Sequence, residues 1–98
     1  MKEPVDRHEI WDRLYNRLSD EFTKRNPKNA EYARMFIAII LSAGESRDMT
    51  YIDGIGLLTH CQLLGFKTEY MKQLLQLSWK TIDEEKAIKK AFLNNKNN

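Results

Sequence analysis

The chain has 98 residues, a length that suits one domain and is too short for two. Hydrophobic residues make up 42% of it and charged residues 31%, a composition typical of globular proteins and not of disordered or fibrous ones. Its 16 basic and 14 acidic side chains give a net charge of +2, which is too small to indicate a nucleic-acid partner on its own.

Cysteine content and apolar runs predict the compartment. Cys61 is the single cysteine, so the fold cannot depend on an internal disulfide. The N-terminal residues are not followed by the apolar run of a secretory signal, and neither end carries a lipidation motif. The longest apolar stretch, residues 35–41, is far shorter than the roughly 20 residues that cross a bilayer. We therefore expect a cytoplasmic protein without a membrane partner.

The first predicted helix covers residues 5–24. Pro4 suits its first turn, where a missing N–H costs nothing, and Pro27 follows its end. Large apolar residues recur at spacings of three and four and form one stripe along it: Trp11, Leu14, Tyr15, Leu18 and Phe22. We expect this stripe to face the core.

The second predicted helix covers residues 30–43. Asn29 is a good N-cap, and Gly44 is expected to end the helix. From Met35 to Leu41 the segment is apolar all round, a pattern typical of a helix that is buried on most sides. We therefore expect this helix to lie at the centre of the domain.

The third predicted helix covers residues 51–64, and Gly65 is expected to end it. Thr50 and Asp53 have the spacing of a capping box. Gly54 and Gly56 would weaken the first turns of such a helix, since glycine is a poor helix former. Either they permit a close helix crossing, or the helix begins near residue 55.

The C-terminal part is expected to form two further helices, over residues 68–78 and 82–93. Thr68 is the expected N-cap of the former, and Thr81 with Glu84 has capping-box spacing for the latter. Residues 94–98 are polar and low in complexity, and we expect them to be disordered. The sequence thus predicts a single all-α domain over residues 1–93, a compact bundle of four or five short helices.

Residues 57–78 resemble a helix-turn-helix unit. The small residue Cys61 precedes Leu64-Gly65-Phe66, a turn in which glycine can adopt a positive φ between two apolar residues. Met71 and Leu74 are then spaced to face the preceding helix. This pattern predicts a helical hairpin and makes a DNA-binding unit one of the functional hypotheses.

On the DNA hypothesis, the helix over residues 68–78 enters the major groove. Its polar side chains would contact bases and phosphates, as lysine, glutamine and threonine do in known complexes. The residues concerned are Lys67, Thr68, Lys72, Gln73, Gln76 and Lys80. Residues 67–98 contain seven basic and four acidic side chains, which favours this hypothesis. Glu69 would repel phosphate, and an ordinary helical hairpin has the same apolar pattern.

The alternative hypothesis is a protein–protein interaction module, such as an adaptor or inhibitor. Aromatic side chains are favoured at the centres of interfaces, and Tyr70 and Trp79 are the aromatic residues least easily assigned to the core. A homodimer would be the simplest use of a leftover apolar face.

Catalysis and metal binding are not predicted. His60 and Cys61 are neighbours on a helix, so their side chains point about 100° apart and do not face each other. The histidines and the cysteine lack the paired spacing of zinc sites, and the Gly54-Ile55-Gly56 segment lacks the third glycine of a nucleotide-binding loop. We therefore expect a small regulatory or binding protein that is not an enzyme and uses no cofactor.

Overall fold

The structure, a computed structural model, describes residues 8–96. Within this range every regular element is helical, as the sequence predicts. The elements are α1 (Ile10–Arg25), the 3-10 turn η1 (Pro27–Asn29), α2 (Ala30–Ser46), α3 (Met49–Ile52), α4 (Ile55–Leu64) and α5 (Thr68–Lys96).

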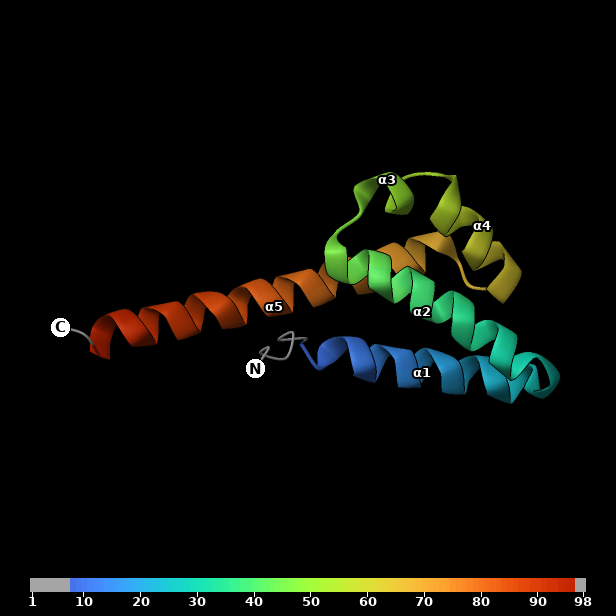
Figure 1. The fold of residues 1–98 in the computed structure, drawn as a ribbon, viewed down its shortest axis with the longest axis horizontal. Coiled ribbons are helices and arrows are strands. Elements are labelled where there is room, and N and C mark those ends of the chain that lie inside the picture. The colour runs from blue at the N-terminus through green and yellow to red at the C-terminus, as the bar shows by residue number, and fades with distance from the viewer. Residues whose placement is uncertain (1–7, 97–98) are drawn as a thin grey trace, which may run out of the picture.

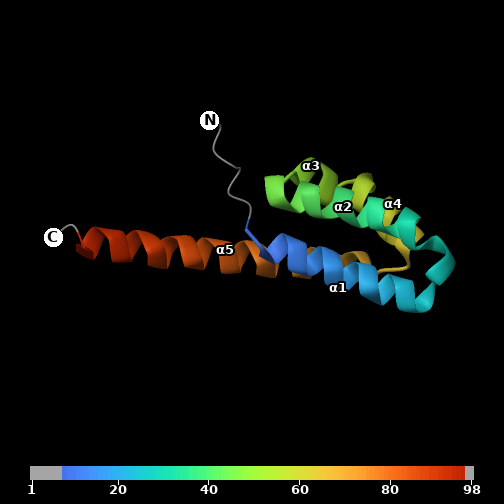
Figure 2. The same cartoon turned by 60° about the horizontal axis from the view of Figure 1, so that its bottom comes forward.

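The helices form a compact bundle with one long projection. α1 and α2 make an antiparallel hairpin, and α3 and α4 lie on the far side of α2 from α1 (Figure 1). The first half of α5 packs into this group, and its second half extends past all other helices in both views (Figures 1 and 2). The described chain therefore measures 56 Å along its longest axis and 29 and 26 Å along the others. We call residues 83–96 the arm.

The core draws side chains from every α-helix. The large apolar side chains that are almost wholly buried are Trp11, Leu18, Ile37, Ile40, Leu41, Leu57, Met71 and Leu75. In α1 the predicted stripe is buried except for Tyr15, which packs at the edge of the core. The stripe is therefore core, as expected from its helical spacing.

α1 begins later than predicted. Its first helical residue is Ile10, and the expected start at residue 5 is wrong because His8 and Glu9 are not helical. The imidazole Nδ1 of His8 accepts a hydrogen bond from the backbone N–H of Ile10 at 3.1 Å. A side chain therefore satisfies one of the N–H groups that a helix start leaves without an intrahelical partner. The predicted role of Pro4 lies outside the described residues.

Gly44 does not end α2, contrary to the prediction. The helix continues to Ser46, and Arg47 ends it in the left-handed conformation with φ 54°. Gly44 is buried, and a Cβ placed there would lie 2.5 Å from Cδ2 of Leu75 and 3.1 Å from the Trp11 ring. Glycine is therefore needed here for the close approach of α5 and α1, not for a turn.

α2 is central, but it is not buried on most sides as expected. Ile37, Ile40 and Leu41 are in the core, whereas Met35 is 55% exposed and Ile39 40% exposed. The bundle covers α2 with α1, with α3 and α4, and near its C-terminal end with α5. Met35 and Ile39 lie on the side that these described elements leave exposed. An apolar surface stripe results.

The predicted third helix is two helices. α3 ends at Ile52 and α4 begins at Ile55, which confirms the alternative start near residue 55. The capping box of Thr50 and Asp53 does not form, because the Asp48 carboxylate accepts the N–H of Tyr51 and caps α3 instead. At Gly56 a Cβ would lie 2.5 Å from the Tyr51 ring, so this glycine permits the close contact.

The predicted α4–α5 hairpin forms. Gly65 ends α4 with φ 77°, a conformation in which glycine carries no steric penalty. The Phe66 N–H bonds to the Cys61 carbonyl at 3.0 Å and the Gly65 N–H to that of Gln62 at 3.2 Å. This pair of bonds is the Schellman arrangement that closes helix ends at glycine.

The two C-terminal helices expected from the sequence are one continuous helix, α5. The capping box at Thr81 does not form, because the Thr81 hydroxyl donates to the carbonyl of Leu77 one turn earlier. No glycine or proline interrupts residues 78–82, so nothing forces the chain out of the helix. α5 also includes residues 94–96, which were expected to be disordered; Asn97 and Asn98 lie outside the described residues.

Candidate interaction surfaces

The side chains predicted to read DNA differ in how far they are exposed. Gln73, Gln76 and Lys80 are exposed and share one face at spacings of three and four, and Lys67 is exposed just before the helix. Glu69 is exposed on the same face, one turn before Gln73. The exposed ridge therefore carries both signs of charge.

Thr68 and Lys72 are half-buried, unlike the exposed residues of that ridge. The Thr68 side chain hydrogen-bonds Cys61, and the ammonium of Lys72 lies 3.7 Å from a carboxylate oxygen of Asp53. Of the six predicted residues, these two therefore have partners within the protein itself.

Tyr70 and Trp79, the predicted interaction residues, are both half-buried. Tyr70 borders a shallow hollow with Glu21 and Phe66. The indole N–H of Trp79 donates to the Gly44 carbonyl at 2.7 Å, so this ring fastens α5 to the end of α2.

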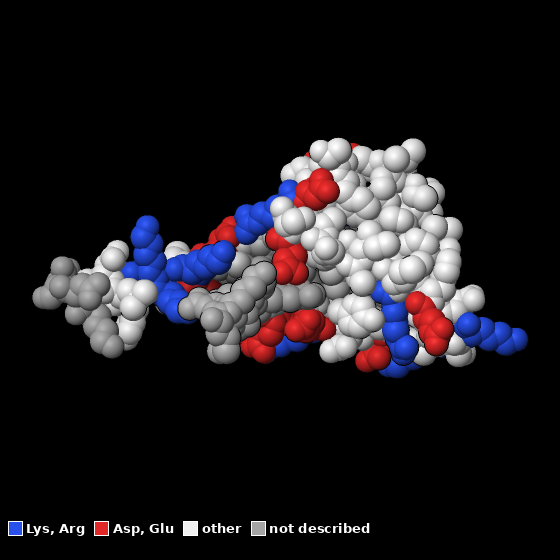
Figure 3. Space-filling model, in the orientation of Figure 1, with Lys and Arg blue, Asp and Glu red and all other residues white. Residues whose placement is uncertain are grey.

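A further apolar surface lies on α2, α3 and α4, where the sequence predicted no site. We call it the neutral face; its side chains are Tyr32, Met35, Phe36, Ile39, Tyr51, His60 and Leu63. Residues 35–44 and 54–66 contain no Lys, Arg, Asp or Glu. Figure 3 accordingly shows a broad area without charge over these helices. Two long uncharged runs in so short a chain were the signal that could have revealed it.

Aromatic contacts stiffen the neutral face. The Tyr32 and Phe36 rings meet edge to face with centroids 4.6 Å apart, and Phe36 lies 4.8 Å from the His60 ring. The Tyr51 hydroxyl is 2.6 Å from Nδ1 of His60. Burial, and less strongly the charge of the Cys61 sulfur, raises the pKa of Tyr51 to about 12. The phenol therefore stays protonated at neutral pH and can donate to His60.

A second hollow, of about 440 Å³, lies where the N-terminal end of α1, the C-terminal end of α2 and the start of the arm meet. Trp11, Trp79 and Ile82 contribute its apolar wall, and charged side chains of both signs surround it. The Arg47 guanidinium lies 5.5 Å from the centre of the Trp79 ring and bonds the Asp83 carboxylate at 2.6 Å. This contact lowers the pKa of Asp83.

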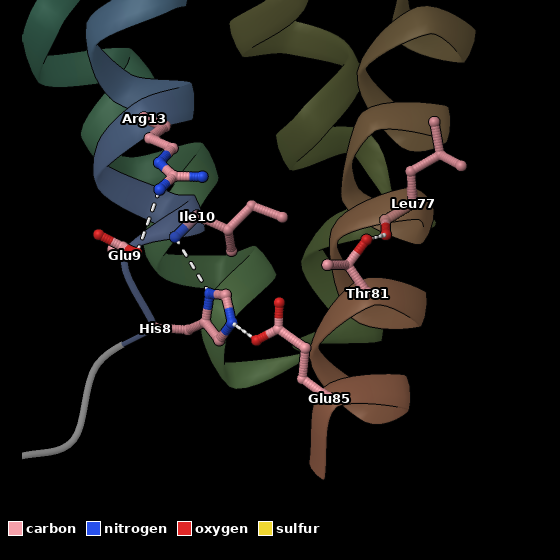
Figure 4. A network of polar contacts seen from close by, with 7 residues as sticks. All are labelled: His8, Glu9, Ile10, Arg13, Leu77, Thr81 and Glu85. Carbon is pink, nitrogen blue, oxygen red and sulfur yellow. Dashed lines mark hydrogen bonds and ion pairs between the residues drawn. The ribbon is translucent and has the colours of Figure 1, made fainter. Parts of the chain in front are cut away.

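His8 also joins α1 to the arm at this hollow (Figure 4). Its Nε2 lies 2.6 Å from a carboxylate oxygen of Glu85, while Nδ1 accepts from the Ile10 N–H. Because Nδ1 is an acceptor, the proton of the neutral ring must be on Nε2, which donates to Glu85. The polar contacts of His8 with Glu85 and of Arg47 with Asp83 thus join separate helices.

The geometry offers no nucleophile–base pair at His60 and Cys61. Cys61 is wholly buried, and burial raises the pKa of its thiol despite the opposing hydrogen bond with Thr68. A thiol of this kind is a poor nucleophile. Among the described residues, no three His, Cys, Asp or Glu side chains are grouped to hold a metal ion.

No helix in the described range combines the length and apolar character needed to cross a bilayer. Comparison with known protein families, with characterised proteins and with solved structures gives no match for this chain.

Proposed function

We propose that this chain is a non-enzymatic protein-binding module whose neutral face docks against an apolar, weakly charged surface of another protein. The observation that carries this proposal is the exposure of Met35, Ile39 and Leu63 on helices whose charged residues are confined to their ends. Contiguous apolar surface of this kind on a small protein typically marks an interaction site. The free thiol of Cys61 accords with a cytoplasmic location.

The chemistry of the face indicates the kind of partner. Met is adaptable and aromatic rings supply large contact area at little entropic cost, so both are enriched at interface centres. The pairing of Phe36 and Tyr51 with His60 holds the centre of the face in one conformation before binding. A partner that presents an amphipathic helix would fit such a surface.

Site-specific photo-cross-linking in the native cells tests this proposal. A photoreactive residue at Met35 or Leu63 should yield the same cross-linked protein, identified by mass spectrometry, whereas one at the exposed Asp20 of α1 should not. Met35→Glu should abolish the adduct formed from position 63 while leaving the circular dichroism spectrum unchanged. Equal adducts from positions 20, 35 and 63, or none from positions 35 and 63, would overturn the proposal.

DNA binding is the second candidate function, favoured by the exposed ridge of Lys67, Gln73, Gln76 and Lys80. A regulator of this type would bind duplex DNA with an affinity that falls steeply as salt rises. Fluorescence anisotropy with a short duplex at about 50 mM salt is the appropriate measurement. Lys80→Glu should weaken binding, whereas Lys28→Glu on the distant η1 turn should change it less. If the chain binds no duplex at this salt concentration, this candidate is excluded.

A further inference from the structure

A groove of about 300 Å³ lies between α1 and the packed half of α5, residues 68–82. The backbones of these two helices approach each other less closely than those of α1 and α2. Ile10 points from α1 toward α5 beside the groove (Figure 4). We call this hollow the α1–α5 groove; its lining residues are Ile10, Arg13, Leu14, Arg17, Leu74, Leu77, Ser78 and Thr81.

Apolar side chains form much of the groove. Leu14 is buried where it lines the groove, and Ile10 and Leu74 are half-buried. Leu77 is 61% exposed although it belongs to the packed half of α5. Large apolar groups left open between two helices favour the docking of a further helix.

The hydroxyl groups in the groove do not call for a polar occupant. Ser78 donates to the Leu74 carbonyl at 2.8 Å, and Thr81 donates to the Leu77 carbonyl at 3.0 Å. Both donors are satisfied within α5, so an apolar occupant that excludes water leaves neither of them without a partner.

Arginine side chains border the groove on α1. Arg13 and Arg17 are one turn apart and both are exposed. Arg13 bonds the Glu9 carboxylate at 3.1 Å, a contact between two highly exposed side chains that contributes little. Arg17 has no acidic partner among the described residues. This border therefore offers carboxylates two cations about 6 Å apart along the helix axis.

More basic side chains lie further along the same pair of helices. The hollow beside Tyr70 joins the end of α1 to residues 65–70, whereas the α1–α5 groove joins the start of α1 to residues 74–81. Arg25 and Lys67 line this second hollow together with the acidic Glu21. Basic side chains therefore outnumber acidic ones among the described residues that line the two hollows. Tyr70, a predicted interaction residue, adds an aromatic ring there.

We propose that the α1–α5 groove binds an amphipathic helix of a partner protein whose apolar stripe is flanked by acidic residues. The apolar stripe packs on Ile10, Leu74 and Leu77. Carboxylates one turn apart on its flank bond Arg13 and Arg17. A helix with basic flanks is rejected, because it would place like charges beside the two arginines. The groove is separate from the neutral face, so either proposal can fail without the other.

Selection from a library of displayed helical peptides tests the charge preference. The library fixes leucine at helical spacing and varies the flanking positions among Glu, Lys, Gln and Ser. The unaltered chain should enrich Glu on the flanks, and a chain with Arg13→Glu and Arg17→Glu should enrich Lys instead. Lys28→Glu combined with Arg34→Glu is the matched control. It makes the same change of charge at exposed positions outside the groove and should keep the preference for Glu.

Affinity measurements on an enriched peptide test the location. Leu77→Glu should raise its dissociation constant about 10-fold or more, because the variant places a carboxylate in the apolar contact. Leu77 is exposed, so this variant should keep the circular dichroism spectrum of the unaltered chain. Met35→Glu on the neutral face should leave the affinity unchanged, which separates this proposal from the proposed function.

Three results would overturn the proposal: no enriched peptide, a preference for Glu that survives reversal of both arginines, or binding that is lost with Met35→Glu and kept with Leu77→Glu. Binding to phosphatidylglycerol vesicles without an enriched peptide would also overturn it, by assigning the groove to a lipid surface.

Discussion

The two halves of α5 belong to one unbroken helix but differ in what surrounds them. Residues 68–82 bury Met71, Leu75, Ser78 and Ile82 against the bundle, whereas residues 83–94 expose every side chain. Helix continuity is therefore a local property, set by the absence of glycine and proline, and burial is not. The comparison separates residues that hold the bundle together from residues that stay exposed on the same helix.

Truncating a buried side chain should produce the largest difference between the halves. Leu75→Ala in the packed half is expected to lower the free energy of unfolding by about 2–5 kcal/mol, because it leaves a cavity in the core. Ile88→Ala in the arm should change it by less than about 0.5 kcal/mol, because Ile88 is exposed. Urea denaturation measures both, and equal losses would contradict the division of α5.

A proline substitution should have different consequences in the packed half of α5 and in the arm. In a helix interior it costs about 3 kcal/mol, because it removes a hydrogen bond and clashes with the preceding turn. Gln76→Pro is expected to unfold much of the bundle. Ala87→Pro should reduce the helical circular dichroism signal of the arm while the core still melts cooperatively. Global unfolding by Ala87→Pro would show that the arm supports the bundle.

Gly65 at the start of the packed half allows a purely conformational test. Nothing lies within 4 Å of a Cβ built there, so Gly65→Ala introduces no clash. The left-handed φ of 77° should still cost about 1 kcal/mol with alanine. Thermal denaturation should show this loss, and Ala87→Gly in the arm should leave the melting of the bundle unchanged.

Tyr51, in α3, should make the free energy of unfolding of the bundle sensitive to alkaline pH. Its pKa is raised to about 12, so the stabilisation from its protonated form is complete below the ordinary tyrosine value near 10 and is lost as pH rises through about 12. Absorbance at 295 nm should show one tyrosine that ionises later than the others. Tyr51→Phe should remove that late step; a single transition near pH 10 in the folded protein would contradict the burial.

Asp83, where the halves meet, should give the smallest effect because it is exposed to solvent. The Arg47 guanidinium lowers its pKa, so the stabilisation is present above the ordinary value of about 3.9 and is lost as pH falls through the lower folded value. NMR titration of the carboxyl carbon should show the shift. Arg47→Ala should return the titration toward the ordinary value, and an unchanged midpoint would contradict the ion pair.

Part of the candidate site could be predicted from the sequence. The turn at Gly65 and the exposed Lys67, Gln73, Gln76 and Lys80 follow from glycine chemistry and helical spacing, which are local. The partners of Thr68 and Lys72 could not be predicted, because Cys61 and Asp53 belong to other segments. The same is true of the Arg47–Asp83 contact, which joins residues 36 positions apart.

The sequence by itself determined that this chain is helical, which residues of α1 face inward, and where α4 turns into α5, because each of these depends on neighbours within one or two turns. The tertiary structure decided which side of α2 is covered and how far α5 extends past the core. Apolar periodicity marks a face as fit for burial, but whether that face is buried depends on where the other helices pack.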